Sequence, residues 1–170
     1  MNRLLRCLFV VGILAGCLSC DQASKHLAQA SLGASPPRFL LHGAVQLELV
    51  RNRGAFLSLG EELPTPARAF LFVILVSAVL VAMLCFAMSS RQVPPRGLLA
   101  LSLLAGGGAG NLLDRLLHDG AVVDFVSLGI GPLRTGVFNL ADMTILIGIM
   151  LLASTVWPDS SPAATPAPET

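Results

Sequence analysis

The amino-acid sequence predicts a mainly α-helical membrane protein, with four transmembrane helices and a small β-sheet beside the membrane. Of its 170 residues, 54% are hydrophobic and only 12% are charged, whereas a soluble domain carries about 25% charged residues. Four apolar segments come close to the ~20 residues that a helix needs to cross a bilayer. Between them lie two stretches with the pattern of β-strands. We therefore expect one membrane-embedded domain over 1–157.

The predicted transmembrane helices cover 4–20, 69–88, 97–113 and 138–157. The first is interrupted only by Arg6, and the first and third are short enough to need extension into their polar flanks. Trp157 is a typical interfacial anchor and Pro158 a typical stop after the fourth. The segment 158–170 is rich in Pro and Ala, which predicts a disordered tail.

The basic residues near the first helix favour one orientation. Arg3 and Arg6 stand at its start without acidic neighbours, which favours a cytoplasmic N-terminus. Four crossings then place both termini, and the tail, in the cytoplasm. The number of basic residues on each side does not decide the orientation, because the side opposite the cytoplasm would carry seven basic residues and the cytoplasmic side four. We keep this orientation because the first helix usually dominates topology.

The first segment also resembles a lipoprotein signal peptide. Its basic start, short apolar core and Leu-Ala-Gly-Cys at 14–17 fit such a signal. Three further apolar segments follow, however, and leave no soluble domain to tether. Asp21 and Lys25 have the i, i+4 spacing of a continuing helix. We therefore interpret the first segment as a retained transmembrane helix.

Two stretches outside the helices predict the sheet. Residues 44–50 alternate between apolar side chains and the polar Gln46 and Glu48, which is the pattern of a half-buried strand. The apolar run 121–128 is followed by Gly-Ile-Gly-Pro at 129–132, a turn signal. We expect these stretches to form a small sheet on the membrane surface.

Polar residues gather at one end of the third and fourth helices. Asn111, Asp114 and Arg115 are spaced i, i+3 and i+4, and so share one face of the third helix. Asn139 and Asp142 share one face at the start of the fourth. With four crossings, both clusters and the second predicted strand meet at the same membrane boundary. Converging carboxylates and amides in a dry site suit acid–base hydrolysis.

Asp142 is the first candidate catalytic residue, because a carboxylate inside an apolar helix costs about 2.5–3.5 kcal/mol on insertion scales. Its partner could be Asp21, Asp114, Asp119 or Asp124. The first two have a basic residue nearby, which would keep them ionised. Asp119 lies in a predicted wet turn, whereas Asp124 is surrounded by apolar residues. We therefore predict that Asp124 and Asp142 share one proton, so that one activates water and the other acts as acid.

Each candidate also has a structural interpretation. Asp142 could be a carboxylate favoured by a helix N-terminus, and Asp124 a turn residue beside a strand. Asp21 and Lys25 could be a structural helix pair, and the third-helix cluster a hydrogen-bonded group without chemistry. Glycines 106–110 are typical of close helix packing, because no phosphate-binding Gly-Lys-Ser/Thr follows.

Other kinds of site receive little support. The four cysteines lack metal-ligand spacing with the three scattered histidines, so we expect no metal and no cofactor. The net charge is only +1 and there is a single Trp, so we expect no nucleic-acid partner. A proton-coupled transporter would need polar groups near the bilayer midplane, yet 69–88 is apolar except for Ser77. A non-catalytic membrane scaffold would need no carboxylate pair.

Five short motifs occur together in this chain: Asp-Gln-Ala-Ser-Lys at 21–25, Asn-Arg-Gly-Ala-Phe at 52–56, a glycine-rich run ending in Asn-Leu-Leu-Asp-Arg at 107–115, Val-Val-Asp-Phe at 122–125 and Phe-Asn-Leu-Ala-Asp at 138–142. In this order and spacing the chain resembles bacterial lipoprotein signal peptidase, also called signal peptidase II or prolipoprotein signal peptidase. The resemblance extends from the first helix through the fourth.

The resemblance implies an intramembrane aspartyl endopeptidase of the bacterial inner membrane. Such enzymes have four transmembrane helices and a small periplasmic sheet cradle. They remove signal peptides from diacylglyceryl-modified prolipoproteins, cutting before the lipobox cysteine near the periplasmic face. Globomycin-type cyclic peptides inhibit them, and we expect a monomer in contact with membrane lipids. The family's catalytic pair falls on Asp124 and Asp142, and its supporting residues fall on Asp21, Lys25, Asn52, Gly54, Asn111, Asp114, Arg115 and Asn139.

Overall fold

A computed structural model describes residues 2–33, 35–55, 59–90 and 92–156. The predicted anchor Trp157 and the predicted tail 158–170 lie outside these ranges. The helices are α1 (Arg3–Leu32), α2 (Thr65–Ala69), the π-helical turn η3 (Phe70–Leu75), α3 (Val76–Ser89), α4 (Pro95–Leu117) and α5 (Leu140–Val156). The strands are β1 (Arg38–Leu40), β2 (Val45–Asn52), β3 (Val122–Ile130) and β4 (Leu133–Arg134), with the 3₁₀ turn η1 (Leu41–Gly43) after β1. The predicted mainly helical fold with a small sheet is confirmed.

Three helices in the described ranges are long and apolar enough to cross a membrane: Arg3–Leu32, Thr65–Ser89 and Pro95–Leu117. The second of these is the continuous α2–η3–α3 helix. The helix α5 is also apolar but has 17 residues, the lower end of the ~17–25 that span a bilayer. Its crossing of the membrane, and hence the fourth span, stays a prediction.

Two helix ends differ from the predicted boundaries because residues there have partners elsewhere in the fold. The first helix continues well past residue 20 to Leu32, since Asp21 and Lys25 form a buried ion pair along it. The fourth begins at Leu140 rather than at Phe138, because Phe138 pairs with Val126 of β3 in an isolated bridge. The helix therefore starts directly beside the sheet.

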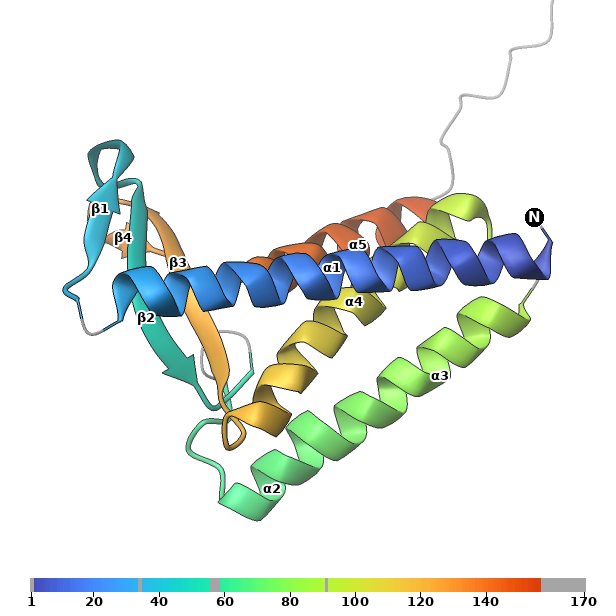
Figure 1. The fold of residues 1–170 in the computed structure, drawn as a ribbon, viewed down its shortest axis with the longest axis horizontal. Helices are drawn as coiled ribbons and strands as arrows, with labels where there is room; N and C mark the ends of the chain where they lie inside the picture. Colours follow the sequence, from blue (N-terminus) through green and yellow to red (C-terminus); the bar gives the residue numbers. More distant parts are fainter. Residues whose placement is uncertain (1, 34, 56–58, 91, 157–170) are drawn as a thin grey trace, which may run out of the picture.

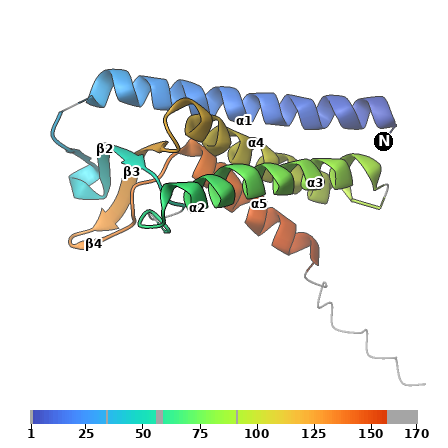
Figure 2. The ribbon, with the colours of Figure 1, turned by 90° about the horizontal axis from the view of Figure 1, so that it is seen from below.

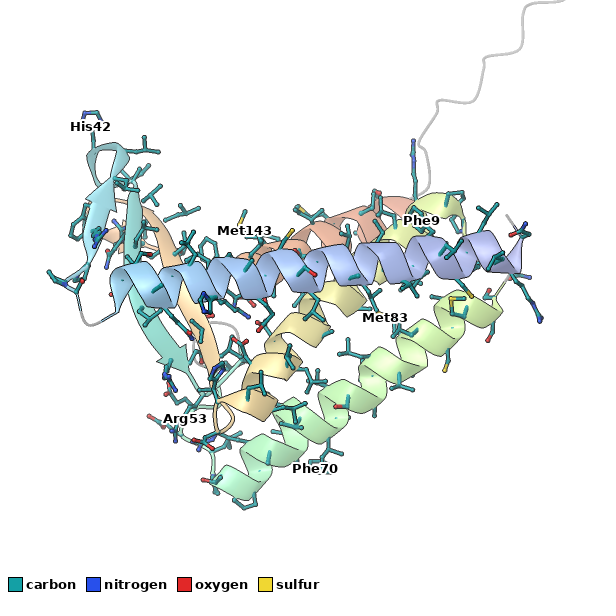
Figure 3. All side chains as sticks on the ribbon, in the orientation of Figure 1. Phe9, His42, Arg53, Phe70, Met83 and Met143 are labelled. Carbon is teal, nitrogen blue, oxygen red and sulfur yellow. The ribbon has the colours of Figure 1, made fainter. Side chains whose placement is uncertain are left out.

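The sheet lies at one end of the helices, and the N-terminus lies at the other (Figure 1). A view turned by 90° shows the same separation, with α1 along one side of the molecule (Figure 2). The labelled side chains Phe9, Met83 and Met143 stand on the helices, whereas His42 and Arg53 stand at the sheet end (Figure 3).

The sheet is antiparallel throughout, in the order β1-β2-β3-β4. Its central pair, β2 and β3, aligns Val50 with Asp124 and Asn52 with Val122. The register shifts between Leu47 and Val50. The predicted strand at 44–50 is confirmed as β2 (Val45–Asn52), and its side chains from 45 to 50 are all partly buried. The predicted turn after β3 is confirmed.

The helix α4 is the centre of the bundle, since it packs against α1, α3 and α5. Its glycines allow this close approach. A Cβ atom on Gly106 would lie 2.7 Å from Cys17 of α1, and one on Gly108 would lie 2.7 Å from the Leu80 side chain of α3. On Gly107 it would lie 2.6 Å from the Ala141 carbonyl oxygen of α5. Small residues in such positions are the usual way for membrane helices to pack.

Replacing Gly107 by alanine is expected to destabilise the protein by about 1–3 kcal/mol, because overpacking costs this much and the backbone oxygen of Ala141 has no rotamer to yield. Gly12 of α1 is the matched control, since nothing lies within 4 Å of a Cβ built there. Gly12→Ala should be neutral or slightly stabilising, as alanine favours helices. Thermal unfolding of both variants in detergent measures the difference. Equal unfolding temperatures would contradict close packing at Gly107.

Candidate active site

The two predicted catalytic residues line one small pocket between the sheet and the helix ends. Asp124 lies on β3 and is 2% exposed, and Asp142 lies in the first turn of α5 and is half-buried. The pocket has a volume of about 30 Å³, enough for one or two water molecules. Its lining residues are Asn52, Ala55, Asn111, Arg115, Val122, Asp124, Val137 and Asp142.

Asp142 is held by the start of its own helix. The backbone N–H of Asp142 donates to the Asn139 side-chain oxygen at 3.0 Å, and the backbone N–H of Asn139 donates to Asp142 Oδ2 at 3.1 Å. This reciprocal pair is a capping box, with an aspartate in the position usually taken by glutamate. It satisfies two N–H groups that a helix start leaves unpaired. Asp142 therefore caps the start of α5 through Oδ2, and its Oδ1 is directed elsewhere.

Two asparagine amides connect the aspartates. Asn139 Nδ2 donates to Asp124 Oδ1 at 2.7 Å and to Asn111 Oδ1 at 3.0 Å. Asn111 Nδ2 donates to Asp142 Oδ1 at 2.8 Å. Asp124 thus accepts a hydrogen bond from Asn139, and Asp142 accepts one from Asn111. The two asparagine side chains are also bonded to each other. Such donors set the orientation of both carboxylates before any substrate arrives.

The second oxygen of Asp124 is bonded to the end of β2. Asn52 Nδ2 donates to Asp124 Oδ2 at 3.0 Å and to the Ala55 carbonyl oxygen at 3.0 Å. The Asn52 side-chain oxygen accepts the backbone N–H of Gly54 at 2.9 Å, which closes a local turn after the strand. Asn52 therefore holds the loop 52–55 against Asp124.

The environment of Asp124 favours its protonated form. Burial raises the pKa of Asp124 from 3.8 to about 6. The hydrogen bond from Asn52 acts in the opposite direction, the negative charge of Asp142 raises the pKa further, and Asn139 and Lys25 lower it. Desolvation is the largest cause because a charged carboxylate loses its water in this position. A carboxyl group that titrates near neutral pH can act as a general acid.

Arg115 fills the side of the pocket next to the loop after β2. Its guanidinium donates to the Gly54 carbonyl oxygen at 2.7 Å and to the Asn111 carbonyl oxygen at 3.2 Å. It also lies over the Phe72 ring of η3, 5.3 Å from the ring centroid. Four apolar residues at or beside the site were not predicted: Phe72, Ala55, Val122 and Val137. An apolar side chain carries by itself no sequence signal that distinguishes a place at a site from ordinary packing.

The remaining predicted site residues lie beside the pocket. Lys25 Nζ contacts Asp21 Oδ2 at 2.7 Å and Asp114 Oδ2 at 3.1 Å, and it donates to Asn111 Oδ1 at 3.2 Å. Gly54 contributes its carbonyl oxygen to Arg115. The structure therefore brings all ten predicted residues into one connected polar group. Within the described ranges there is no group of three or more His, Cys, Asp or Glu side chains that could hold a metal ion.

Comparison with known proteins identifies the family. The family model described as Signal peptidase (SPase) II matches residues 13–157. The chain belongs to the signal peptidase II family. Curated relatives of this signal peptidase II include the lipoprotein signal peptidases of Syntrophomonas wolfei (38% identical, covering 78% of this chain and 81% of the relative) and Streptomyces griseus (35% identical, covering 89% and 73%). This signal peptidase II is thus a protease.

A solved structure supports the same conclusion. It is described as a bacterial membrane enzyme and superposes on this signal peptidase II with a TM-score of 0.75. The two chains are 26% identical, and the match covers 95% of this chain and 94% of that one. Together with the apolar helices, this likeness makes this signal peptidase II a membrane enzyme of bacterial type.

Proposed function

We propose that this signal peptidase II removes the signal peptide from diacylglyceryl-modified prolipoproteins, by an aspartic mechanism and just before the lipobox cysteine. The observation that carries the proposal is the pocket shared by Asp124 and Asp142, which has room for one or two waters. Among the described residues that line it, the two carboxylates of Asp124 and Asp142 are the acidic groups, and such a pair can activate a water molecule as the nucleophile. The chain's relatives are lipoprotein signal peptidases, which supports this substrate class.

In the proposed mechanism Asp124 carries the shared proton and Asp142 is ionised. The apolar surroundings of Asp124 favour its neutral form. Asp142 lies at a helix N-terminus, where a negative charge is favoured, and its oxygens accept two N–H donors. Water bound between them then faces one base and one acid.

The reaction proceeds by direct attack of water on the scissile carbonyl carbon. As the new C–O bond forms, Asp142 takes a proton from the water and Asp124 gives its proton to the carbonyl oxygen. The C–N bond then breaks. Asp142 passes its proton to the departing amine, and the tetrahedral intermediate returns a proton to Asp124. The products are the signal-peptide carboxylic acid and the amine of the modified cysteine, and both aspartates are restored.

We further propose that the active site faces the periplasm, with both termini, including 158–170, in the cytoplasm. The sheet, next to which the pocket lies, and the N-terminus are at opposite ends of the molecule (Figure 1), which supports this orientation in the inner membrane. Exposed apolar side chains on α3 and α5, among them Val81 and Met150, would face membrane lipids and the acyl chains of the substrate. We propose a monomer, because one chain supplies the whole pocket, and inhibition by globomycin-type cyclic peptides that occupy it.

The test is incubation of the purified protein in detergent with a diacylglyceryl-modified prolipoprotein. The expected result is release of the signal peptide and of a mature protein that begins at the modified cysteine. The same prolipoprotein with an unmodified cysteine is the control, and it should stay intact. Intact lipidated substrate would contradict the proposal.

The proposed acid makes a prediction about pH. Because Asp124 must be protonated, kcat/KM should fall as pH rises above the raised pKa of about 6, by about tenfold per pH unit. Asn52→Ala should move this decline to higher pH, since the Asn52 amide stabilises the ionised carboxylate. Initial rates at low substrate concentration across pH 5 to 9 measure both curves. A decline that stays in place, or moves to lower pH, would contradict the role of Asp124 as acid.

A further inference from the structure

Two further aspartates lie behind the pocket without lining it. Asp21 of α1 and Asp114 of α4 are each 1% exposed. A buried carboxylate is costly unless it is paired and hydrogen-bonded. Both are paired with the single lysine of the chain, Lys25. The hydrogen bonds that these two carboxylates accept from backbone N–H groups show what the pairing supports.

Each buried aspartate holds the backbone next to one catalytic residue. Asp21 Oδ1 accepts the backbone N–H of Ala141 at 2.9 Å, one residue before Asp142. Asp114 Oδ2 accepts the backbone N–H of Val123 at 2.9 Å, one residue before Asp124. The first bond also satisfies an N–H that the start of α5 would otherwise leave unpaired.

The two holding aspartates are joined to each other by Lys25 and by Gln22. Lys25 Nζ contacts Oδ2 of both. Gln22 Nε2 donates to Asp114 Oδ1 at 2.8 Å and to Asp21 Oδ2 at 3.3 Å. Gly110 makes room for this arrangement, because a Cβ atom there would lie 2.6 Å from Asp21 Oδ2.

We propose that Asp21, Gln22, Lys25 and Asp114 form a positioning unit, here called the brace, that sets the separation of Asp124 and Asp142. The proposal rests on the proposed function of that pair. Asp124 lies on a strand and Asp142 on a helix, and the brace connects the two backbones through side chains of α1 and α4. Gln22 is thereby a positioning residue, which neither the composition nor the polar clusters of the sequence indicated. A misplacement of about 1 Å in an active site can cost 10²-fold in rate.

The first experiment compares two double variants, Asp21→Asn/Lys25→Met and Asp21→Leu/Lys25→Met. The brace has formal charge −1 in the wild type, from two carboxylates and one ammonium. It also has charge −1 in both variants, from Asp114 alone. Asparagine keeps an oxygen that can accept the Ala141 N–H, whereas leucine of similar size does not. Comparing the two variants therefore measures the effect of the hydrogen bond from the Ala141 N–H at constant charge.

We expect kcat of the leucine variant to be at least ~10-fold below that of the asparagine variant, with KM within about twofold, because the aspartates are misplaced while the substrate surface is kept. Both are assayed on a lipidated prolipoprotein, and folding is checked by thermal unfolding in detergent. Equal kcat values in two folded variants would overturn the brace.

A milder pair decides the question if the leucine variant does not fold. Gln22→Met removes one of the two links between the holding aspartates and keeps the Lys25 link. Gln29→Met makes the same change two turns along α1. The Gln29 side chain makes no hydrogen bond to any described residue. We expect Gln22→Met to lower kcat about 3- to 10-fold at unchanged KM and Gln29→Met to leave both unchanged. A Gln22→Met variant with wild-type kcat and only a lower unfolding temperature would overturn the proposal, because the brace would then be structural alone.

Failure of the brace and failure of the proposed function give different results. If the wild type does not cleave the lipidated prolipoprotein, the proposed function fails. If the wild type cleaves it, but neither brace comparison changes kcat, the function stands and the brace is wrong.

Discussion

Replacing either Asp124 or Asp142 by asparagine is expected to lower kcat roughly 10³-fold, within the 10²–10⁴ that general acid–base catalysis contributes. An amide can neither take the proton of the attacking water nor share one with its neighbour. Asparagine keeps the shape of the side chain, so the pocket should persist. The measurement is single-turnover cleavage of a diacylglyceryl-modified prolipoprotein by each variant in detergent.

Asp119→Asn is the matched control for both substitutions. Asp119 is exposed in the turn after α4, with a positive φ of 52°, a conformation that asparagine tolerates. This variant should cleave at the wild-type rate. Retention of more than about a tenth of the wild-type rate by either active-site variant would exclude the shared-proton mechanism, because general acid–base roles are worth at least 10²-fold.

Replacing Lys25 by methionine is expected to lower the free energy of unfolding by about 3–5 kcal/mol, the usual cost of removing one partner from a buried ion pair. The side chain of Lys25 is 3% exposed, and those of both its carboxylate partners are 1% exposed. Methionine fills a similar volume, so the loss comes from two carboxylates left without a cation. Denaturant-induced unfolding in detergent micelles measures it.

Arg51→Met is the control for the loss of one positive charge, because Arg51 of β2 is exposed. Its effect should lie within about 0.5 kcal/mol, as for most surface substitutions. If Lys25→Met were no more destabilising than Arg51→Met, the ion pairs would contribute nothing to stability. A further substitution of Asp21 by asparagine should recover part of the loss, since it removes one of the unpaired carboxylates.

Much of the helical architecture could be predicted from local patterns. Long apolar segments predicted the helices, because an apolar helix satisfies its own backbone and needs no knowledge of its neighbours. The surroundings of Asp124 and the position of Asp142 also indicated unusual carboxylates. Helix boundaries were predicted less accurately. The helix α1 extends to Leu32, and α5 starts after Phe138. Both depend on partners that lie far away along the chain.

The register of the sheet and the contacts between polar side chains could not be predicted from patterns of neighbouring residues. The register shift between Leu47 and Val50 of β2 could not be predicted, since it depends on how β2 pairs with β3. Gln22 gave no signal of its own, because its partner Asp114 is 92 residues away. Phe72 likewise contacts Arg115 only through the packing of the helix that contains η3 against α4.

The sequence by itself determined where the apolar helices lie and which acidic residues stand in apolar surroundings, because both follow from residues close together along the chain. Only the tertiary structure decided that Asp124 and Asp142 line one pocket and that amides from two elements orient them. The physical reason is that hydrogen bonds act over about 3 Å in space, whatever the separation in sequence.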